Sequence, residues 1–467
     1  MDFREHSVVE LGHRVSRGEV SARQLTTSAL ERIEALDPIY NAFVCVHPEQ
    51  ALADAAAIDQ RIADGHVVGP LAGIPIGVKD LEDAAGFATR YGSVLSNDAV
   101  CTRDSVLVAR LKAAGCVVVG KTTTPEYGHK AATDSPLTGI TRNPWNLERS
   151  AGGSSGGSAV ALATGMIPLA TGSDGGGSIR IPSALCGLSG IKCTQGVVPN
   201  GGPTPPGSGL FTVKGPMALR ARDLALVLDV CAGPELTDPF TSPSLVRGFM
   251  DGIDEGLVPK IAWSPTMGFA SVDTEIASIC AEAIERLSET GVEVIEIDDV
   301  WHSDPLAPWL SQWTALRANA QGHLRDTDDW DKIDPSLRFL IEWGLKLTGV
   351  DVINSLGQLH QLNLELNDVW RQAPLLLTPV CAGQTPVLGS EGTIDGTSSS
   401  GWVSFTYGLN ATRNPAGTVN CGMTADGMPV GLQIVGPQFH DVQVLAAVAA
   451  CEEIFGRVSP QNIGGHP

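Results

Sequence analysis

Short apolar runs alternate with amphipathic segments over much of this chain, and the alternation predicts strands and helices in turn. Residues 21–36, SARQLTTSALERIEAL, carry apolar side chains at helical spacing and begin with Ser21 and Gln24 in the spacing of a capping box. Residues 70–80, PLAGIPIGVKD, form an apolar run interrupted by glycine and proline. The first segment is therefore predicted to be an amphipathic helix, and the second a short buried strand.

Later segments repeat this alternation of apolar and amphipathic stretches. Residues 106–122 predict a helix followed by a strand, and residues 222–233 predict a buried helix. Residues 260–265 and 273–297 predict a strand, a helix and a strand in that order. The recurring order predicts an α/β fold.

The alternation of strand-like and helix-like segments gives way, between about Trp301 and Trp402, to helix-like segments. These segments carry seven of the nine tryptophans, spaced among polar residues. Two interpretations are open. The segment is either a peripheral helical layer or a cover over an apolar ligand, because tryptophan rings serve both purposes.

Composition and charge narrow the class of protein. The chain has 467 residues, of which 43% are hydrophobic and 18% charged, enough to bury the core of one large or two medium domains. Its net charge of −21 disfavours nucleic acid and anionic membranes as partners. The N-terminus lacks the uninterrupted apolar core of a signal peptide, and no stretch approaches a membrane span in length. We therefore expect a cytoplasmic protein.

The ten cysteines are scattered, contain no CxxC pair and lie partly in apolar runs such as AGCVVVG. This distribution indicates reduced core residues rather than disulfides or metal ligands. The chain also lacks an HExxH motif and paired Cys/His spacing, so neither a metal nor another cofactor is expected.

Two clusters of glycine and serine lie close together, AGGSSGGSAV at 151–160 and GSDGGGSIRIP at 172–182. Flexible linkers have polar surroundings, whereas the first cluster continues into the apolar run AVALATGMIPLAT. Both clusters are therefore predicted to be buried. Consecutive glycines also let backbone N–H groups converge, so residues 175–178 could form an oxyanion hole.

A nucleophilic serine needs a base, and no histidine lies near either cluster in the sequence. No nucleophile elbow of the α/β-hydrolase type is apparent either. Lys79, at the end of the apolar run GIPIGV, is an alternative base, because burial would lower its pKa enough to leave it neutral. An ordinary ion pair with the adjacent Asp80 is the competing interpretation.

Four segments, GIPIGVKD, RNPWN with SAGGSSGGSAVALATG, GSDGGGSIRIPSALCGLSGIK and GPMALRARDLALVLDVCAG, resemble the signature region of the amidase signature family of serine hydrolases. The segment NATRNPAGTVNCGMTADGMPVGLQIVGP resembles the closing part of that family, and residues 300–400 match least well. The resemblance implies a large central mixed β-sheet flanked by helices. It also implies a single domain over residues 1–467, with a signature core at 71–235 and a helical, tryptophan-rich region at 300–400.

Carried over by position, the resemblance implies a catalytic triad of Lys79 as base, Ser154 as bridging serine after a cis peptide bond, and Ser178 as nucleophile. The implied oxyanion hole consists of the backbone N–H groups of Gly175, Gly176, Gly177 and Ser178. Three supporting residues complete the implied site: Ser155 in the first loop, and Asp174 with Arg180 as a buried ion pair.

The family resemblance implies hydrolysis of small-molecule amides through an acyl-enzyme, by a monomer or homodimer without cofactor. The glycine-rich loop at 175–178, the implied oxyanion loop, and the tryptophan-rich region suggest a roomy site for aryl or acyl amides or for carbamates. The Gly/Pro-rich segment 193–211 is either a mobile rim of that site or a passive surface loop. The alternative is the glutamine amidotransferase subunit of a tRNA-dependent complex. Residues 121–145, with Pro-Glu-Tyr-Gly, favour the general amidases over that alternative. A catalytically silent binding protein is a third possibility, which the intact triad disfavours.

Overall fold

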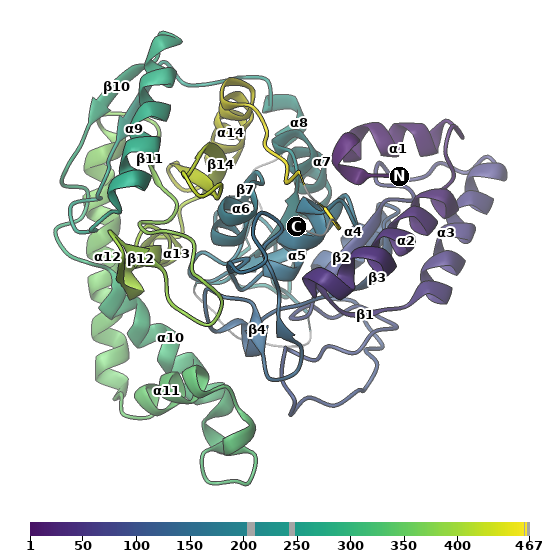
Figure 1. The fold of residues 1–467 in the computed structure, drawn as a ribbon, viewed down its shortest axis with the longest axis horizontal. Coiled ribbons are helices and arrows are strands. Elements are labelled where there is room, and N and C mark those ends of the chain that lie inside the picture. The colour runs from purple at the N-terminus through teal and green to yellow at the C-terminus, as the bar shows by residue number, and fades with distance from the viewer. Residues whose placement is uncertain (203–210, 242–247, 462, 465–467) are drawn as a thin grey trace.

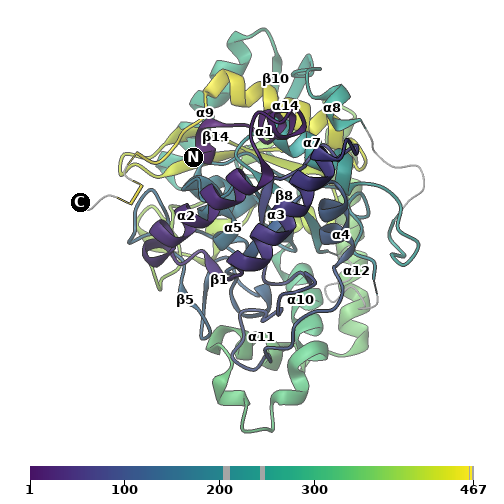
Figure 2. The ribbon, with the colours of Figure 1, turned by 90° about the vertical axis from the view of Figure 1, so that its right-hand side faces the viewer.

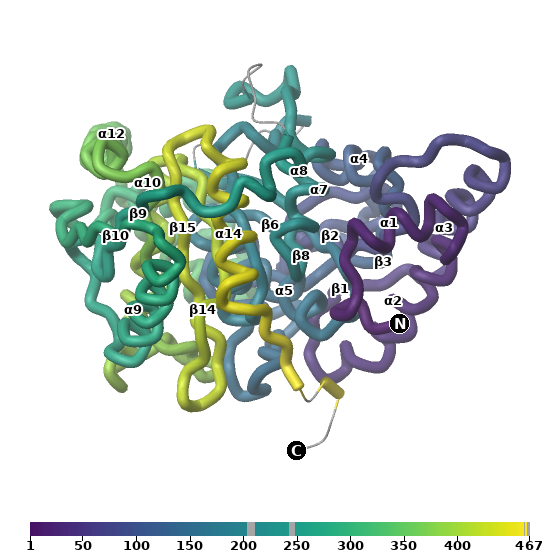
Figure 3. The backbone as a smooth tube through the Cα atoms, turned by 90° about the horizontal axis from the view of Figure 1, so that it is seen from above, coloured from purple at the N-terminus to yellow at the C-terminus, as the bar shows by residue number. Residues whose placement is uncertain are grey.

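The computed structural model describes residues 1–202, 211–241, 248–461 and 463–464. Its strands form two mixed sheets, and helices flank them on both faces (Figures 1 and 3). The α/β class with mixed sheet and flanking helices is thus confirmed. The one large sheet that the sequence implied is divided into two hydrogen-bonded sheets, which meet where strands β7 and β8 lie in contact.

The first sheet has five strands in the order β1-β3-β2-β6-β8. Strands β2, β3 and β6 run parallel, and the two edge strands are antiparallel to their neighbours. The bounds are β1 Phe43–Val46, β2 Pro75–Lys79, β3 Val117–Thr122, β6 Leu169–Asp174 and β8 Val213–Ala218.

The second sheet has six strands in the order β10-β9-β11-β15-β14-β7. Strands β10, β9 and β11 are parallel, and the remaining pairs are antiparallel. The bounds are β7 Gly190–Lys192, β9 Lys260–Trp263, β10 Glu293–Glu296, β11 Leu376–Pro379, β14 Ala416–Met423 and β15 Pro429–Val435. Two small hairpins lie outside the sheets, β4 Asp134–Ser135 with β5 Gly139–Ile140 and β12 Thr393–Ile394 with β13 Thr397–Ser398.

Most helices form a layer around the sheets. Three others form a projecting group, which we call the helical arm. The layer comprises α1 Val8–Ser16, α2 Ala22–Tyr40, α3 Pro48–Ala63, α4 Val106–Ala113, α5 Gly156–Ala163, α6 Arg180–Cys186, α7 Ala221–Cys231, α8 Phe249–Gly252, α9 Thr274–Glu289, α13 Tyr407–Ala411 and α14 Asp441–Phe455. The arm comprises α10 Leu306–Gln321, α11 Pro335–Gly344 and α12 Gly349–Trp370. Short 3-10 helices occur at Phe3–Glu5, Glu126–Gly128, Gly322–Leu324, Trp330–Lys332 and Ser400–Val403.

The segments with the clearest hydrophobic pattern form the predicted elements. Helix α2 begins after Ser21, whose side chain caps the Gln24 N–H while the Gln24 side chain accepts from the Ser21 N–H, so the predicted capping box is present. Strand β2, the helix-strand pair α4–β3, helix α7 and the series β9–α9–β10 also form where expected.

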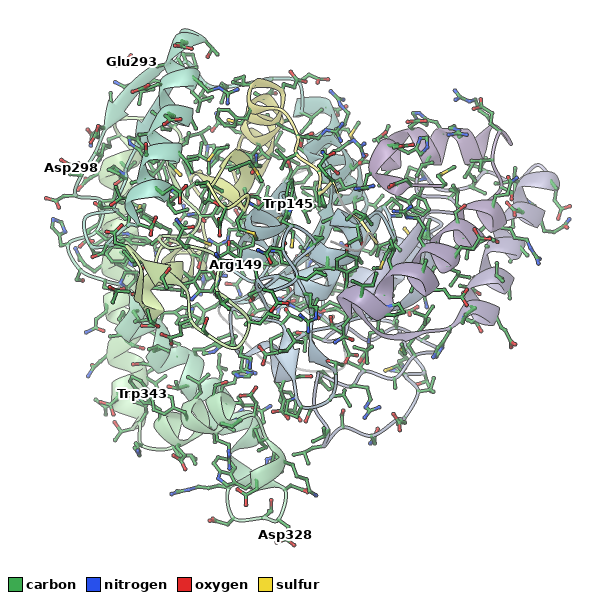
Figure 4. The ribbon with its side chains drawn as sticks, in the orientation of Figure 1. Trp145, Arg149, Glu293, Asp298, Asp328 and Trp343 are labelled. Carbon is green, nitrogen blue, oxygen red and sulfur yellow. The ribbon has the colours of Figure 1, made fainter. Side chains whose placement is uncertain are left out.

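The tryptophan-rich region is largely helical, as predicted, and projects from one end of the molecule in Figures 1 and 2. Figure 4 places Asp328 at the outer end of this arm and Trp343 farther back along it. The region also contains β11 and the β12–β13 hairpin, which the sequence did not predict. Trp301, Trp313 and Trp402 are buried, so much of the aromatic content packs the protein itself.

One buried hydrophobic cluster extends from α1 to α14 and includes residues of both sheets. None of the ten cysteines forms a disulfide in the described structure, and eight are buried, as expected of core thiols; Cys45 and Cys101 are partly exposed. Within the described ranges, no helix has the length and apolar character needed to cross a bilayer. Residues 203–210 of the Gly/Pro-rich segment 193–211 lie outside the described residues.

Candidate active site

Lys79 ends strand β2 with a fully buried side chain and an amine surrounded by hydroxyl groups. Its Nζ lies 2.8 Å from Ser154 Oγ, 2.8 Å from Ser155 Oγ and 3.0 Å from Ser173 Oγ. The backbone N–H of Lys79 donates to Thr171 Oγ1 on the neighbouring strand β6. The structure therefore brings together the lysine and the first glycine-serine loop, as expected.

The three hydroxyl neighbours can satisfy Lys79 Nζ in either protonation state. An ammonium would donate to all three oxygens, whereas a neutral amine would donate two N–H groups and accept from the third hydroxyl on its lone pair. The Ser155 hydroxyl lies 3.3 Å from the Ser173 carbonyl, to which it donates, and its oxygen accepts from Lys79. The lone pair of Lys79 is then available to the hydroxyl of Ser154 or Ser173.

Burial lowers the pKa of Lys79 to about 7, although the carboxylates of Asp174 and Glu82 act in the opposite direction. The competing interpretation, an ion pair between Lys79 and Asp80, is wrong. Asp80 pairs instead with Lys121, whose Nζ lies 3.4 Å from Asp80 Oδ1, with both side chains buried. Consecutive residues at a strand end point to opposite faces, which separates the two neighbours.

Ser154 follows a cis peptide bond from Gly153, as the resemblance implied. A side chain at Gly153 is impossible without movement, since its Cβ would lie within 2.5–2.7 Å of the Ala132 backbone. Ser158, four residues further on, donates to the Thr171 carbonyl at 2.8 Å and contacts Thr122 Oγ1 at 2.7 Å. It therefore supports the loop and does not reach Lys79.

The segment Pro-Glu-Tyr-Gly lies beside Ser154, because a Cβ on Gly128 would come within 3.2 Å of Ser154 Oγ. Glu126 is buried and accepts from Ser93 Oγ at 2.6 Å and from the Asp334 N–H at 2.7 Å. This carboxylate joins the loop at the candidate site to the start of α11, and thus to the helical arm.

Ser178 and Gly176 are partly exposed, whereas Gly175 and Gly177 beside them are buried. Its carbonyl accepts from the Ser155 N–H at 3.2 Å, which links the two glycine-serine clusters directly. Its hydroxyl makes no hydrogen bond to any residue that the structure describes. The two clusters thus belong to one buried assembly, in which a single serine hydroxyl is left accessible.

Asp174 and Arg180 form the predicted buried ion pair, with bidentate contacts of 3.0 and 2.9 Å. Burial alone would raise the pKa of Asp174, but the Arg180 guanidinium outweighs it and holds that pKa well below its usual range. Arg180 also donates to Gln433 Oε1 at 2.8 Å and to Asn410 Oδ1 at 2.6 Å. The pair therefore ties the second loop to β15 and α13.

The expected set of oxyanion donors needs one correction. The Gly177 N–H donates to Asp174 Oδ1 at 2.7 Å, because the carboxylate turns back to bind the loop that follows it. The N–H groups of Gly175, Gly176 and Ser178 make no hydrogen bond to another described residue. Of the four expected donors, only Gly177 therefore has its N–H occupied within the described structure.

The sequence suggested that the missing side chains of Gly175 and Gly176 leave open space for a substrate, but the structure shows no open space at these two positions. A Cβ on Gly175 would lie 2.9 Å from the Trp313 ring, and one on Gly176 would lie 2.6 Å from the Trp309 ring. Both tryptophans belong to α10 in the arm. The space that the absent side chains leave is filled by indole rings, so aromatic groups border the loop directly.

Three residues around the site were not predicted from the sequence: Ser173, Asn410 and Gln433. Ser173 could have been found, because Thr171 and Ser173 alternate along β6 and therefore face the same side as Lys79. Asn410 and Gln433 had no local signal, since their partners lie more than 200 residues away.

The site contains amine, hydroxyl and backbone groups rather than metal ligands. Within the described ranges, no three His, Cys, Asp or Glu side chains are grouped so as to hold a metal ion. The arrangement offers a buried amine with a lowered pKa, two serine hydroxyls and backbone N–H groups without partners among the described residues, a set of groups that suits acyl transfer.

Comparison with known proteins agrees with this chemistry. The sequence model of the amidase family matches residues 24–445. The chain is 36% identical over 468 residues to an acylamidase from Rhodococcus erythropolis, covering 96% of this chain and 95% of that protein. It is 32% identical over 483 residues to a glutamyl-tRNA(Gln) amidotransferase subunit from Cutibacterium acnes, with 96% and 95% coverage. The solved structure of a bacterial aryl acylamidase of the amidase signature family superimposes with a TM-score of 0.91, at 28% identity, covering 99% of each chain.

We predict that Arg180→Met destabilises the protein strongly, because it leaves the Asp174 carboxylate buried without its cation. Losing one partner of a buried pair costs about 3–5 kcal/mol, measurable as the free energy of unfolding in urea. The matched control is Arg371→Met, which removes an ion pair with Asp368 whose side chains are 76% and 69% exposed. The control is expected to change little. Equal, small losses in both variants would contradict the structural role of the pair.

Proposed function

This chain belongs to the amidase signature family of enzymes that hydrolyse amide C–N bonds, and we propose that it cleaves acyl amides through an acyl-enzyme on Ser178. The observation that carries the proposal is the contact of 2.8 Å between Lys79 Nζ and Ser154 Oγ, in a loop that is hydrogen-bonded to Ser178. Lys79 acts as the base, and Ser154 transfers protons between Lys79 and the reacting groups.

In the first half-reaction, Ser154 gives its proton to neutral Lys79 and accepts the proton of Ser178, whose Oγ attacks the amide carbon. The carbonyl π electrons move to oxygen, and the N–H groups of Gly175, Gly176 and Ser178 stabilise the resulting oxyanion. When the tetrahedral intermediate collapses, the C–N bond breaks and the proton held by Lys79 reaches the leaving nitrogen through Ser154. The products are an ester on Ser178 and a neutral amine.

Water completes the reaction by the reverse route. The Lys79–Ser154 pair removes a proton from water as the water oxygen attacks the ester carbon. Collapse of the second intermediate returns the proton to Ser178 Oγ and releases a carboxylic acid. The proton that leaves with the amine is replaced by one taken from water, so all three side chains return to their starting protonation states and the reaction consumes only the amide and water.

Aryl or acyl amides are the substrate class we favour. The similarity to an acylamidase and to an aryl acylamidase supports this class. Aryl carbamates present the same carbonyl and leaving group, so the same residues could cleave them.

The second candidate is a glutamine amidotransferase subunit, which the similarity to the Cutibacterium acnes protein supports. Such a subunit would act on glutamine only together with partner chains. Activity of the purified chain alone on an anilide favours the hydrolase, whereas glutamine-dependent activity that requires partners favours the amidotransferase.

We predict that purified protein releases 4-nitroaniline from an acyl 4-nitroanilide and that Ser178→Ala abolishes the release. Ser183→Ala is the matched control, since its hydroxyl lies on the helix that follows Ser178 and is buried without a partner among the described residues. This control should keep its activity. A matched aryl carbamate measured in parallel separates amidase from urethanase activity. Unchanged turnover in Ser178→Ala would refute the proposed nucleophile.

We also predict that kcat/KM falls on the acidic side of about pH 7. Lys79 must be neutral to accept a proton, and its pKa of about 7 means that it becomes charged below that pH. The profile should therefore rise through about pH 7 and level off above it, and Lys79→Ala should be inactive throughout. A profile that stays flat from about pH 5.5 to 9 would be inconsistent with this base.

A further inference from the structure

The oxyanion loop is braced by a pair of stacked indole rings from the helical arm. Trp309 and Trp313 lie one turn apart on α10, about 130 residues from the loop in sequence, and Figures 1 and 2 show α10 beside α11 and α12. The indole N–H of Trp309 donates to the Gly175 carbonyl at 3.1 Å. The Trp309 ring fills the place that a side chain on Gly176 would take.

A hydrogen bond to this carbonyl also controls the N–H on the other side of the peptide bond. A trans peptide group is planar, so the carbonyl of one residue and the N–H of the next point in opposite directions. A donor that holds the Gly175 carbonyl therefore fixes where the Gly176 N–H points. It also polarises the peptide group and makes that N–H a stronger donor.

The other two available N–H groups are held in the same way. The Asp174 carbonyl, which shares a peptide with the Gly175 N–H, accepts from Asn410 Nδ2 at 2.8 Å. The Gly177 carbonyl, which shares a peptide with the Ser178 N–H, accepts from the Ile181 N–H at 2.7 Å. Each peptide that supplies an oxyanion donor thus has its carbonyl bound, and for the middle peptide the donor is Trp309.

We propose that Trp309 is a positioning residue for catalysis, because its indole N–H orients the Gly175–Gly176 peptide so that the Gly176 N–H faces the developing oxyanion. This inference rests on the proposed function. Trp309 touches no reacting atom and acts through the peptide. Its ring is held by Trp313 and Tyr407, and the Arg317 guanidinium lies 4.5 Å from the Trp313 ring centroid.

Phenylalanine substitutions at the two stacked positions separate hydrogen bonding from packing. Trp309→Phe keeps an aromatic ring but removes the donor to Gly175. Trp313→Phe is the matched control, because it shortens the neighbouring ring and removes an indole N–H that is buried without a hydrogen-bond partner among the described residues. Both variants lose a similar volume from the same stack.

We expect Trp309→Phe to lower kcat about tenfold, with KM within about twofold of the parent enzyme, because misdirecting one oxyanion donor is milder than deleting it. Trp313→Phe should change kcat less than about twofold. Equal losses of kcat in the two variants would mean that the rings only pack, and an effect confined to KM would mean that Trp309 contacts substrate. Either result would overturn the inference.

A spectroscopic measurement tests the same inference without turnover. Labelling glycine with ¹³C at the carbonyl and ¹⁵N at the amide selects Gly–Gly peptides, of which Gly175–Gly176 is one of few in the chain. The Gly176 amide signal should shift more in Trp309→Phe than in Trp313→Phe, and an unchanged signal in Trp309→Phe would overturn the inference. If Ser178→Ala stays active, the proposed function fails, and this signal still decides whether Trp309 orients the peptide.

Discussion

The removal of the Lys79 amine from water is the constraint on which the site depends. A charged ammonium at a fully buried position is costly, so burial favours the neutral form and brings its pKa to about 7. The three surrounding hydroxyls satisfy the neutral amine without adding a charge. The burial that lowers the pKa of Lys79 also requires the neighbouring loops to be tightly packed and poor in side chains.

The buried Asp174–Arg180 ion pair connects the second glycine-serine loop to the second sheet and to α13. The carboxylate binds the Gly177, Ile179 and Arg180 N–H groups, and the guanidinium reaches α13 and β15 in the second sheet. Asp174 thereby fixes the shape of the second loop through three of its backbone N–H groups. Helix α10 also contacts this loop, because the Trp309 indole donates to the Gly175 carbonyl and its ring packs against Gly176. The helical arm therefore contributes to the geometry of the site.

Local sequence signals predicted the elements and most of the candidate site. The capping box at Ser21 and Gln24 predicted α2, and the apolar run before Lys79 predicted a buried strand that ends in a buried lysine. Signals of this kind act within a few residues. The partner of Asp80, the division into two sheets, and the roles of Asn410, Gln433 and Trp309 depend on contacts between distant segments, which no local pattern contains. Gly175 and Gly176 illustrate the limit of a local signal. The sequence shows that their side chains are missing, but only the fold shows that indole rings of α10 occupy the space.

The central claim is that the Lys79 amine loses its proton near pH 7, well below the range of an ordinary lysine, and a direct titration of this amine tests the claim more closely than any rate. Lysine labelled with ¹³C at the ε carbon gives an NMR signal whose shift reports protonation, and Lys79→Met identifies the signal of Lys79. The structure predicts an apparent pKa of about 7 for this amine. A signal that stays in the charged position up to about pH 10, where an ordinary lysine titrates, would contradict the account.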